Sequence, residues 1–211
     1  MKSLFHLTLL ALFILVTACQ KNTTTPTSPE VADYLPLTVG NQWEYHIYTT
    51  NGQGELKLSA TETLEISGTE IINGETYFRL EKERMLSFFF PDYLRVSDQQ
   101  LVDSEGKVFL SLTDAPEVFE RDTVYRSVGE PLAEFARQLD NQPSAVSVPA
   151  GDFDCIRVNT NVISFEPDYP YGERNFNDYF AREVGLIQKD QLYYSSDRLK
   201  IEIRLNSFSV E

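Results

Sequence analysis

Few residues in this chain could perform nucleophilic or zinc chemistry. The 211 residues include two histidines, His6 and His46, and two cysteines, Cys19 and Cys155. A zinc site needs three or four ligands held close together, and His and Cys are too few to supply them. No nucleophile-elbow or papain-like pattern surrounds His46 or Cys155, and there is no phosphate-binding or dinucleotide-binding glycine loop. We therefore expect no metal, no cofactor and no catalytic residue of these classes.

Carboxylates are the one abundant reactive group, with 32 Asp and Glu side chains. Two of them facing each other across a cleft could act as an acid/base pair of the glycosidase type. Asp152 and Asp154 could bind calcium, although the contiguous calcium-loop pattern is absent. In so acidic a chain close carboxylate pairs also arise by chance, so neither pattern is specific.

Residues 1–18 have the pattern of a cleavable export signal. Lys2 supplies a positive charge, and the run from Leu4 to Val16 is apolar except for His6 and Thr8. Its thirteen residues would span about 20 Å as a helix, less than the ~30 Å hydrocarbon core of a bilayer. We expect this segment to be removed, which leaves His46 as the only histidine of the mature chain.

The four residues Val16–Cys19 (VTAC) resemble the lipobox of bacterial lipoproteins. This resemblance implies cleavage between Ala18 and Cys19 and attachment of lipid to Cys19, which would anchor the protein to a membrane that it does not span. The alternative is an ordinary secretory signal with a chance cysteine. Residues 19–33 then read as a polar tether rich in Thr and Pro. Gln20, where an Asp would direct retention in some Gram-negative bacteria, favours the outer membrane; the face, periplasmic or surface, stays open.

Removal of residues 1–18 takes away Lys2 and no acid, so 17 basic side chains face 32 acidic ones and the net charge becomes −15. Such a surface repels nucleic acid, which we exclude as a partner. With Cys19 lipidated, Cys155 has no partner for an intramolecular disulfide. It lies in an alternating segment, and we interpret it as a buried small residue, with a reactive thiol as the alternative.

From Tyr34 onward the sequence has the alternation of antiparallel strands, punctuated by turn residues such as Asn73-Gly74. A longer loop is expected at residues 166–174. The predicted strand segments are 43–48, 56–66, 71–78, 108–112, 146–148, 153–158, 175–182, 186–189, 192–195 and 199–208. The pattern predicts a single, mainly β domain over residues 34–211, as a meander, sandwich or open barrel.

One segment departs from this alternation, at about residues 130–140. Leu132, Phe135, Ala136 and Leu139 are spaced as on one face of a helix, and Pro131 stands where a first helical turn tolerates it. We predict one short amphipathic helix here, packed against the sheet.

Three segments, 34–45 (YLPLTVGNQWEY), 148–158 (VPAGDFDCIRV) and 179–187 (YFAREVGLI), carry a further resemblance. They resemble a group of uncharacterised bacterial lipoproteins with the signatures PL..G..W.Y, VPAG.F and YA..VGLI. The resemblance implies a curved antiparallel sheet or half-open β-barrel, related in shape to lipoprotein-carrier folds, and assigns no catalytic residue. Glu183 replaces the glycine expected before Val184, which should alter only a local turn.

Two aromatic segments are candidate contact sites for a ligand or partner. Residues 85–93 contain Phe88, Phe89 and Phe90 in a run too apolar for a half-buried strand, so they are either core or the lining of a cavity or partner site. Tyr169 and Tyr171 lie in the long loop and could contact carbohydrate or protein, or pack over a barrel mouth.

These observations predict a non-enzymatic envelope lipoprotein that binds an apolar or extended ligand, or an envelope protein partner. A carboxylate-dependent hydrolase of envelope polysaccharide and a purely structural envelope protein are the alternatives.

Overall fold

The computed structural model describes residues 29–211 except residues 52, 114–117, 195 and 197–199. The predicted signal, Ala18, Cys19 and most of the tether lie outside the described residues. Within them the chain forms twelve strands and two short 3₁₀ helices, η1 (Val31–Tyr34) and η2 (Leu86–Phe88), and neither helix could span a membrane. The strands are β1 (Gln42–Thr50), β2 (Leu56–Ile72), β3 (Glu75–Lys82), β4 (Tyr93–Ser97), β5 (Gln100–Asp103), β6 (Val108–Ser111), β7 (Val118–Ser127), β8 (Glu130–Val148), β9 (Gly151–Ser164), β10 (Arg174–Ala181), β11 (Gly185–Leu192) and β12 (Lys200–Ser209).

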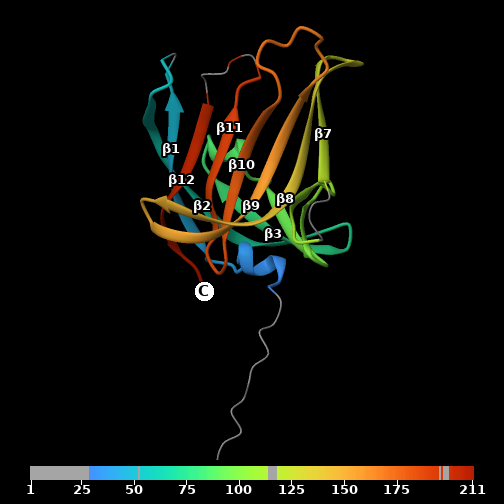
Figure 1. The fold of residues 1–211 in the computed structure, drawn as a ribbon. Coiled ribbons are helices and arrows are strands. Elements are labelled where there is room, and N and C mark those ends of the chain that lie inside the picture. The colour runs from blue at the N-terminus through green and yellow to red at the C-terminus, as the bar shows by residue number, and fades with distance from the viewer. Residues whose placement is uncertain (1–28, 52, 114–117, 195, 197–199) are drawn as a thin grey trace, which may run out of the picture.

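All twelve strands belong to one antiparallel sheet, in the order β6-β5-β4-β3-β2-β1-β12-β11-β10-β9-β8-β7. Every ladder joins strands that are consecutive in the sequence, except the ladder between β1 and β12, which unites two meanders. The sheet curls into a nearly closed barrel (Figure 1), and its edge strands β6 and β7 meet at a seam without a strand ladder between their described residues. This confirms the predicted mainly β class and half-open barrel.

The helix predicted at residues 130–140 is wrong, because these residues begin strand β8. Phe135 and Leu139 have helical spacing, but they also share one face of a strand with Ala133. Strands β7 and β9 pair with β8 on its two sides and supply the backbone hydrogen bonds that an isolated segment would seek within a helix. Pro131 is accommodated near the start of the strand, where the register with β7 is irregular.

The core lies inside the barrel, where alternate residues of the strands meet. Trp43 and Tyr45 of β1 are fully buried. A chain of rings then crosses the interior, with centroid distances of 5.8 Å from Tyr45 to Phe90, 5.7 Å from Phe90 to Phe109, and 6.1 Å from Phe109 to Phe180. These contacts join β1, the segment after η2, β6 and β10, so both meanders share one core.

The first and third of the resembling segments meet at one end of this core. The Trp43 indole donates a hydrogen bond of 2.6 Å to the carbonyl of Val184. The next residue, Gly185, has φ +119°, and a Cβ there would lie 3.2 Å from both Leu35 and Trp43. Glycine is required at this position by both its backbone conformation and the close approach of Trp43.

Three turns of the described chain contain a left-handed residue that is not glycine: Asn73, Asp98 and Glu183. Asn73 and Gly74 have φ values of 52° and 86°, which confirms the predicted two-residue hairpin turn between β2 and β3. Glu183, in the turn between β10 and β11, has φ 62°. This is the position where the resemblance predicted glycine, and the turn is formed with glutamate in a conformation that costs it energy.

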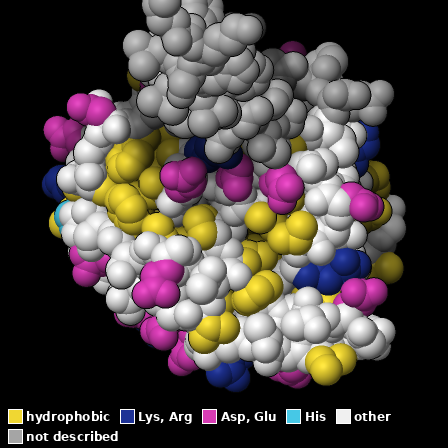
Figure 2. Space-filling view, turned by 90° about the horizontal axis from the view of Figure 1, so that it is seen from below, with side chains coloured by type: hydrophobic (Ala, Val, Ile, Leu, Met, Phe, Trp, Pro, Cys, Tyr) yellow, Lys and Arg dark blue, Asp and Glu magenta, His cyan; other side chains and the backbone are white. Residues whose placement is uncertain are grey.

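Acidic side chains are spread over the lower end of the barrel. Figure 2 shows them both around the outline of this face and near its centre, with apolar surface between them. On this face the negative charge does not gather into one cluster.

Candidate functional site

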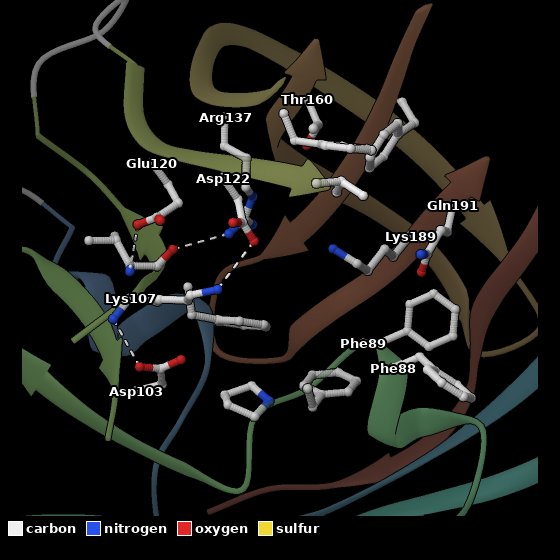
Figure 3. Close-up of a pocket in the computed structure, with 17 residues that line it drawn as sticks. Phe88, Phe89, Asp103, Lys107, Glu120, Asp122, Arg137, Thr160, Lys189 and Gln191 are labelled. Atoms are coloured by element: carbon white, nitrogen blue, oxygen red, sulfur yellow. Dashed lines mark hydrogen bonds and ion pairs between the residues drawn. The ribbon is translucent and has the colours of Figure 1, made fainter. Parts of the chain in front are cut away.

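A cavity of about 440 Å³ lies inside the barrel, beside the seam (Figure 3). It is bounded by the segment around η2, by β6, and by the inner faces of β7 to β11. The lining residues are Phe88, Phe89, Phe90, Pro91, Asp103, Lys107, Val108, Phe109, Glu120, Asp122, Val124, Phe135, Arg137, Thr160, Phe176, Lys189 and Gln191.

One side of the cavity is aromatic. Phe135 of β8 and Phe176 of β10 meet edge to face at 6.1 Å, and Phe109 continues the ring chain of the core. The guanidinium of Arg137 lies 6.0 Å from the ring centre of Phe109 and 5.4 Å from that of Phe119. The aromatic side of the cavity therefore lies next to a cationic side chain. This arrangement suits a molecule with distinct apolar and polar ends.

The polar side is centred on Asp178 of β10, which is almost completely buried. Its Oδ2 accepts a hydrogen bond of 3.1 Å from Arg137 and one of 2.6 Å from Lys189. The register explains the cluster, because Asp178 pairs with Lys189 on β11 and all three side chains point inward. Burial lowers the pKa of Lys189, while the neighbouring Asp178 carboxylate acts in the opposite direction.

Two buried polar atoms in this region have no hydrogen-bond partner among the described residues: Thr160 Oγ1, and Oδ1 of Asp178, a residue that pairs with the cavity cations but does not itself line the cavity. Thr160 lines the cavity and is 2% exposed. A buried polar atom left unpaired costs about 1–3 kcal/mol, so such atoms are rare unless something completes their hydrogen bonds. The Thr160 hydroxyl can both donate and accept, and the Lys189 ammonium in the same lining can donate, so the two can bind a group that both donates and accepts hydrogen bonds.

Side chains close the seam where the ladder is missing. The backbone N–H of Val108 on β6 donates to Glu120 Oε2 of β7 at 2.9 Å, and its carbonyl accepts from Arg137 at 3.1 Å. Lys107 forms an ion pair of 3.2 Å with Asp122. Figure 3 shows these groups on one side of the cavity, opposite Lys189 and Gln191. Arg137 thus belongs both to the seam and to the Asp178 cluster.

The predicted contact residues divide between two places. Phe88, Phe89 and Phe90 all line the cavity, with Phe89 and Phe90 buried and Phe88 68% exposed. Tyr169 and Tyr171 lie elsewhere, in the loop between β9 and β10, where their rings meet edge to face at 5.4 Å. The structure does not bring the two aromatic segments together.

The sequence analysis missed the polar lining residues Arg137, Thr160 and Lys189, and also Asp178, with which Arg137 and Lys189 pair. A signal for Asp178 was present, because Phe176 and Phe180 flank it at two-residue spacing and therefore share its face. A carboxylate between two inward aromatic residues indicates a buried charge that needs a partner.

The other candidate groups for chemistry have structural contacts. Asp103 accepts hydrogen bonds from the backbone of Glu105 and Lys107 in its own turn, and Asp152 accepts one from Ser147. No group of three or more His, Cys, Asp or Glu residues placed to hold a metal occurs in the described part of the chain. The carboxylate-dependent hydrolase stays a prediction.

Cys155 is buried and has no disulfide, as the preferred interpretation expected. Burial, with a smaller contribution from the nearby Asp154 carboxylate, raises the pKa of its thiol to about 12. His46 is half-buried in β1, with its ring 6.2 Å from that of Tyr48.

Comparison with known proteins found similar structures only. No family model and no curated protein matches the chain. A protein of Bacteroides fragilis described as exported, with a YmcC-like fold, has 15% identity and a TM-score of 0.46 over 82% of this chain and 96% of that one. A protein of Parabacteroides distasonis described as a lipoprotein has 13% identity and a TM-score of 0.43, over 83% of this chain and 98% of that one. The hypothetical lipoprotein YmcC of Escherichia coli has 9% identity and a TM-score of 0.33, over 78% and 84%. At these values the function has to be argued from the residues of this chain.

Proposed function

We propose that the protein is a cell-envelope lipoprotein, anchored through Cys19, whose barrel holds a small amphipathic molecule in the cavity beside the seam. The apolar part of this molecule would pack against Phe109, Phe135 and Phe176, and its hydroxyl or amide end would bind Thr160 and the Asp178 cluster. The observation that carries the proposal is the Thr160 Oγ1 atom, which is buried without a partner among the described residues in the lining of an aromatic cavity.

The size and composition of the cavity support this class of ligand. Its volume of about 440 Å³ falls within the ~300–1,000 Å³ common for small-molecule sites. The lining holds equal numbers of cations and carboxylates: Lys107, Arg137 and Lys189 against Asp103, Glu120 and Asp122. A neutral polar end is therefore a better match than a strongly charged one.

The envelope location rests on the N-terminal sequence. The apolar segment of residues 4–16, the VTAC motif that ends at Cys19 and the polar residues after it together indicate export and lipid attachment. Gln20 supports placement in the outer membrane.

The test compares two tryptophan substitutions on β11. Gln191 is exposed at the rim of the cavity, so Gln191→Trp adds bulk at the opening without disturbing the core. Gln188, three residues earlier, faces outward, and Gln188→Trp is the matched control. The full chains are purified from their own envelope in a polyoxyethylene detergent, and small molecules in organic extracts of each are quantified by mass spectrometry.

We expect one amphipathic compound at near-stoichiometric amount in the wild type and in Gln188→Trp, and a loss of about tenfold or more in Gln191→Trp, since blocking a pocket removes more than 1.4 kcal/mol of binding. No bound compound in the wild type, or equal amounts in the two variants, would overturn the proposal.

A further inference from the structure

A second candidate site lies on the outer face of strands β8, β9 and β10, whose inner face lines the cavity. Strands alternate their side chains, so the neighbours of the inward residues Arg137, Thr160 and Phe176 point outward. These outward positions hold a grid of amides in two rows across β8, β9 and β10. The rows are Gln138, Asn159 and Asn177, and Ala136, Asn161 and Asn175.

Asparagine side chains at these positions do not stabilise the strands. Asparagine is depleted in strands, where β-branched and aromatic residues fit the pleated surface better. Here four asparagines occupy adjacent outward positions in the middle of paired strands, rather than the turns where asparagine is common. Positions that depart from local preference without a structural gain are commonly functional.

The amides lie in a groove of about 800 Å³. One part of its lining is the strand face, with Gln138, Asn159, Asn161 and Asn175. The other part comes from the 165–173 loop. Its contributing residues include Glu166, Pro167, Tyr169, Gly172 and Glu173.

Contacts with the segment after β11 fix this loop in place. The ring of Tyr169 stacks on Tyr194 at 4.7 Å, and its hydroxyl donates to the Tyr194 carbonyl at 2.7 Å. The Tyr194 hydroxyl donates in turn to Glu166 at 2.9 Å, and Arg174 donates to the carbonyl of Tyr193 at 2.6 Å. The groove is therefore formed before any ligand arrives, which lowers the entropy cost of binding.

The amides have hydrogen-bonding capacity to spare. Asn161 Oδ1 is buried without a partner, while its amide nitrogen donates to Glu173. Asn159 donates to Asn177 at 3.0 Å through its amide nitrogen. Each amide can donate two and accept two hydrogen bonds, so these contacts satisfy only part of the set.

We propose that this groove binds a neutral oligosaccharide. Sugar hydroxyls both donate and accept, as the amides do, and Pro167 and Tyr169 offer apolar surface for the C–H faces of the rings. Of the three charged groups that line the groove, Arg121 pairs with Glu134 and Glu166 pairs with Arg126, while Glu173 accepts a hydrogen bond from Asn161. The strand face between them carries amides and no charge, in a strongly acidic protein. The site is separate from the interior cavity and independent of its ligand.

The experiment is calorimetric titration of the full chain, in a polyoxyethylene detergent that carries no sugar. The probes are cellohexaose, chitohexaose, the anionic hexagalacturonate and a Gly-Ser hexapeptide. We expect at least one of the two neutral hexasaccharides to bind with a Kd at or below about 1 mM. Hexagalacturonate should bind at least tenfold more weakly, because the acidic surface repels it.

Variants locate the site. Asn175→Ala and Asn161→Ala should each weaken binding by about tenfold, the effect of losing one or two hydrogen bonds. Gln188→Ala removes an outward amide on β11 that does not line the groove, and its affinity should equal that of the wild type. Asn175 is exposed, so Asn175→Ala keeps the fold, which the melting temperature verifies.

Failure of both neutral hexasaccharides to bind with a Kd at or below about 1 mM would overturn the proposal. So would an equal loss of affinity in Gln188→Ala, or binding of the hexapeptide in preference to both, which would assign the groove to a protein segment.

Discussion

The buried hydroxyl of Thr160 lowers the free energy of unfolding of the protein. Its Oγ1 is buried in the cavity wall without a partner, so the hydroxyl has lost its hydration and gained nothing in return. A valine would fill nearly the same space. Residues of this kind are retained where binding requires them, at the expense of stability.

Thr160→Val should therefore raise the free energy of unfolding by about 1 kcal/mol, measured by urea denaturation of the ligand-free protein. The same variant should retain about tenfold less of the compound extracted from the wild type, which is the effect of one lost hydrogen bond to a ligand. A stability gain with unchanged ligand content would show that the hydroxyl does not contact the ligand.

Cys155 makes the stability of the folded protein depend on pH. Its thiol has a pKa of about 12 in the folded state against an ordinary value of 9.0. A raised pKa means that the folded state favours the protonated thiol, so this contribution to stability is present below pH 9 and is lost as the pH rises towards 12.

At pH 8 only roughly one thiol in 10⁴ would be ionised, and burial blocks access as well. Iodoacetamide should label Cys155 in the folded protein at least 100-fold more slowly than in 6 M guanidinium, as followed by mass spectrometry. Comparable rates in the two states would identify a reactive thiol instead.

At the scale of elements, the turn between β10 and β11 is strained at Glu183. A left-handed conformation destabilises the folded state by roughly 1–2 kcal/mol when the residue is not glycine. Replacement by glycine removes this cost, but glycine loses more conformational entropy on folding, which offsets roughly 0.5–1 kcal/mol of the gain.

Glu183→Gly should thus stabilise the protein by about 0.5–1 kcal/mol in urea denaturation. Asn73→Gly is the control, since asparagine tolerates the left-handed region and its replacement should change stability less. An equal gain at both positions would argue against relief of strain at Glu183.

The seam is the element whose stability depends on side chains. Arg137→Met would remove one cation from the buried Asp178 and leave the Val108 carbonyl without its donor. We expect a loss of about 2–3 kcal/mol: the Val108 carbonyl loses its side-chain donor and Asp178 loses one charged hydrogen bond, while Lys189 still pairs with Asp178.

Arg121 serves as the matched control for this prediction, because it forms an exposed ion pair with Glu134 on the neighbouring strand. Arg121→Met should cost no more than about 1 kcal/mol. Equal losses in the two variants would mean that the buried cluster does not stabilise the seam.

Strands were predictable where alternation and turn residues coincide, as at Asn73-Gly74, and the segment that became β8 was not. Leu132, Phe135 and Leu139 satisfy the helical period and nearly satisfy the strand period, and the partners on both sides decide between them. The cavity residues were missed for a related reason. Which residues of β11 face inward depends on a register shift opposite Tyr179/Phe180 that the local sequence does not reveal.

For the whole molecule, the predicted lipid anchor sets where both candidate sites operate. A Cys19→Ala variant should move from the membrane fraction to the soluble periplasmic fraction, because it cannot carry the thioether-linked lipid. Fractionation and immunoblotting measure this, and Cys155→Ala, which should stay with the membrane, is the control. Retention of Cys19→Ala in the membrane would exclude lipid anchoring through this residue.

The wall formed by β8, β9 and β10 would then have two uses. Its inner residues line the aromatic cavity and its outer residues form the amide groove, with adjacent positions of one strand serving opposite faces. Because a one-residue slip would exchange the two sets, the register of this wall is fixed by both faces at once.

The place of β12 in the sheet bears on how the two meanders stay together. It lies between β1 and β11, with six strands on one side and five on the other, and pairs Phe208 with Trp43. Of the twelve described strands, the last in the sequence is therefore the one that joins the two meanders. Without β12, β1 and β11 would each present an open edge of the kind that invites aggregation and proteolysis. A chain that ends before Lys200 would lack the only strand ladder between the described meanders, and the shared aromatic core and the side chains at the seam would have to hold them together.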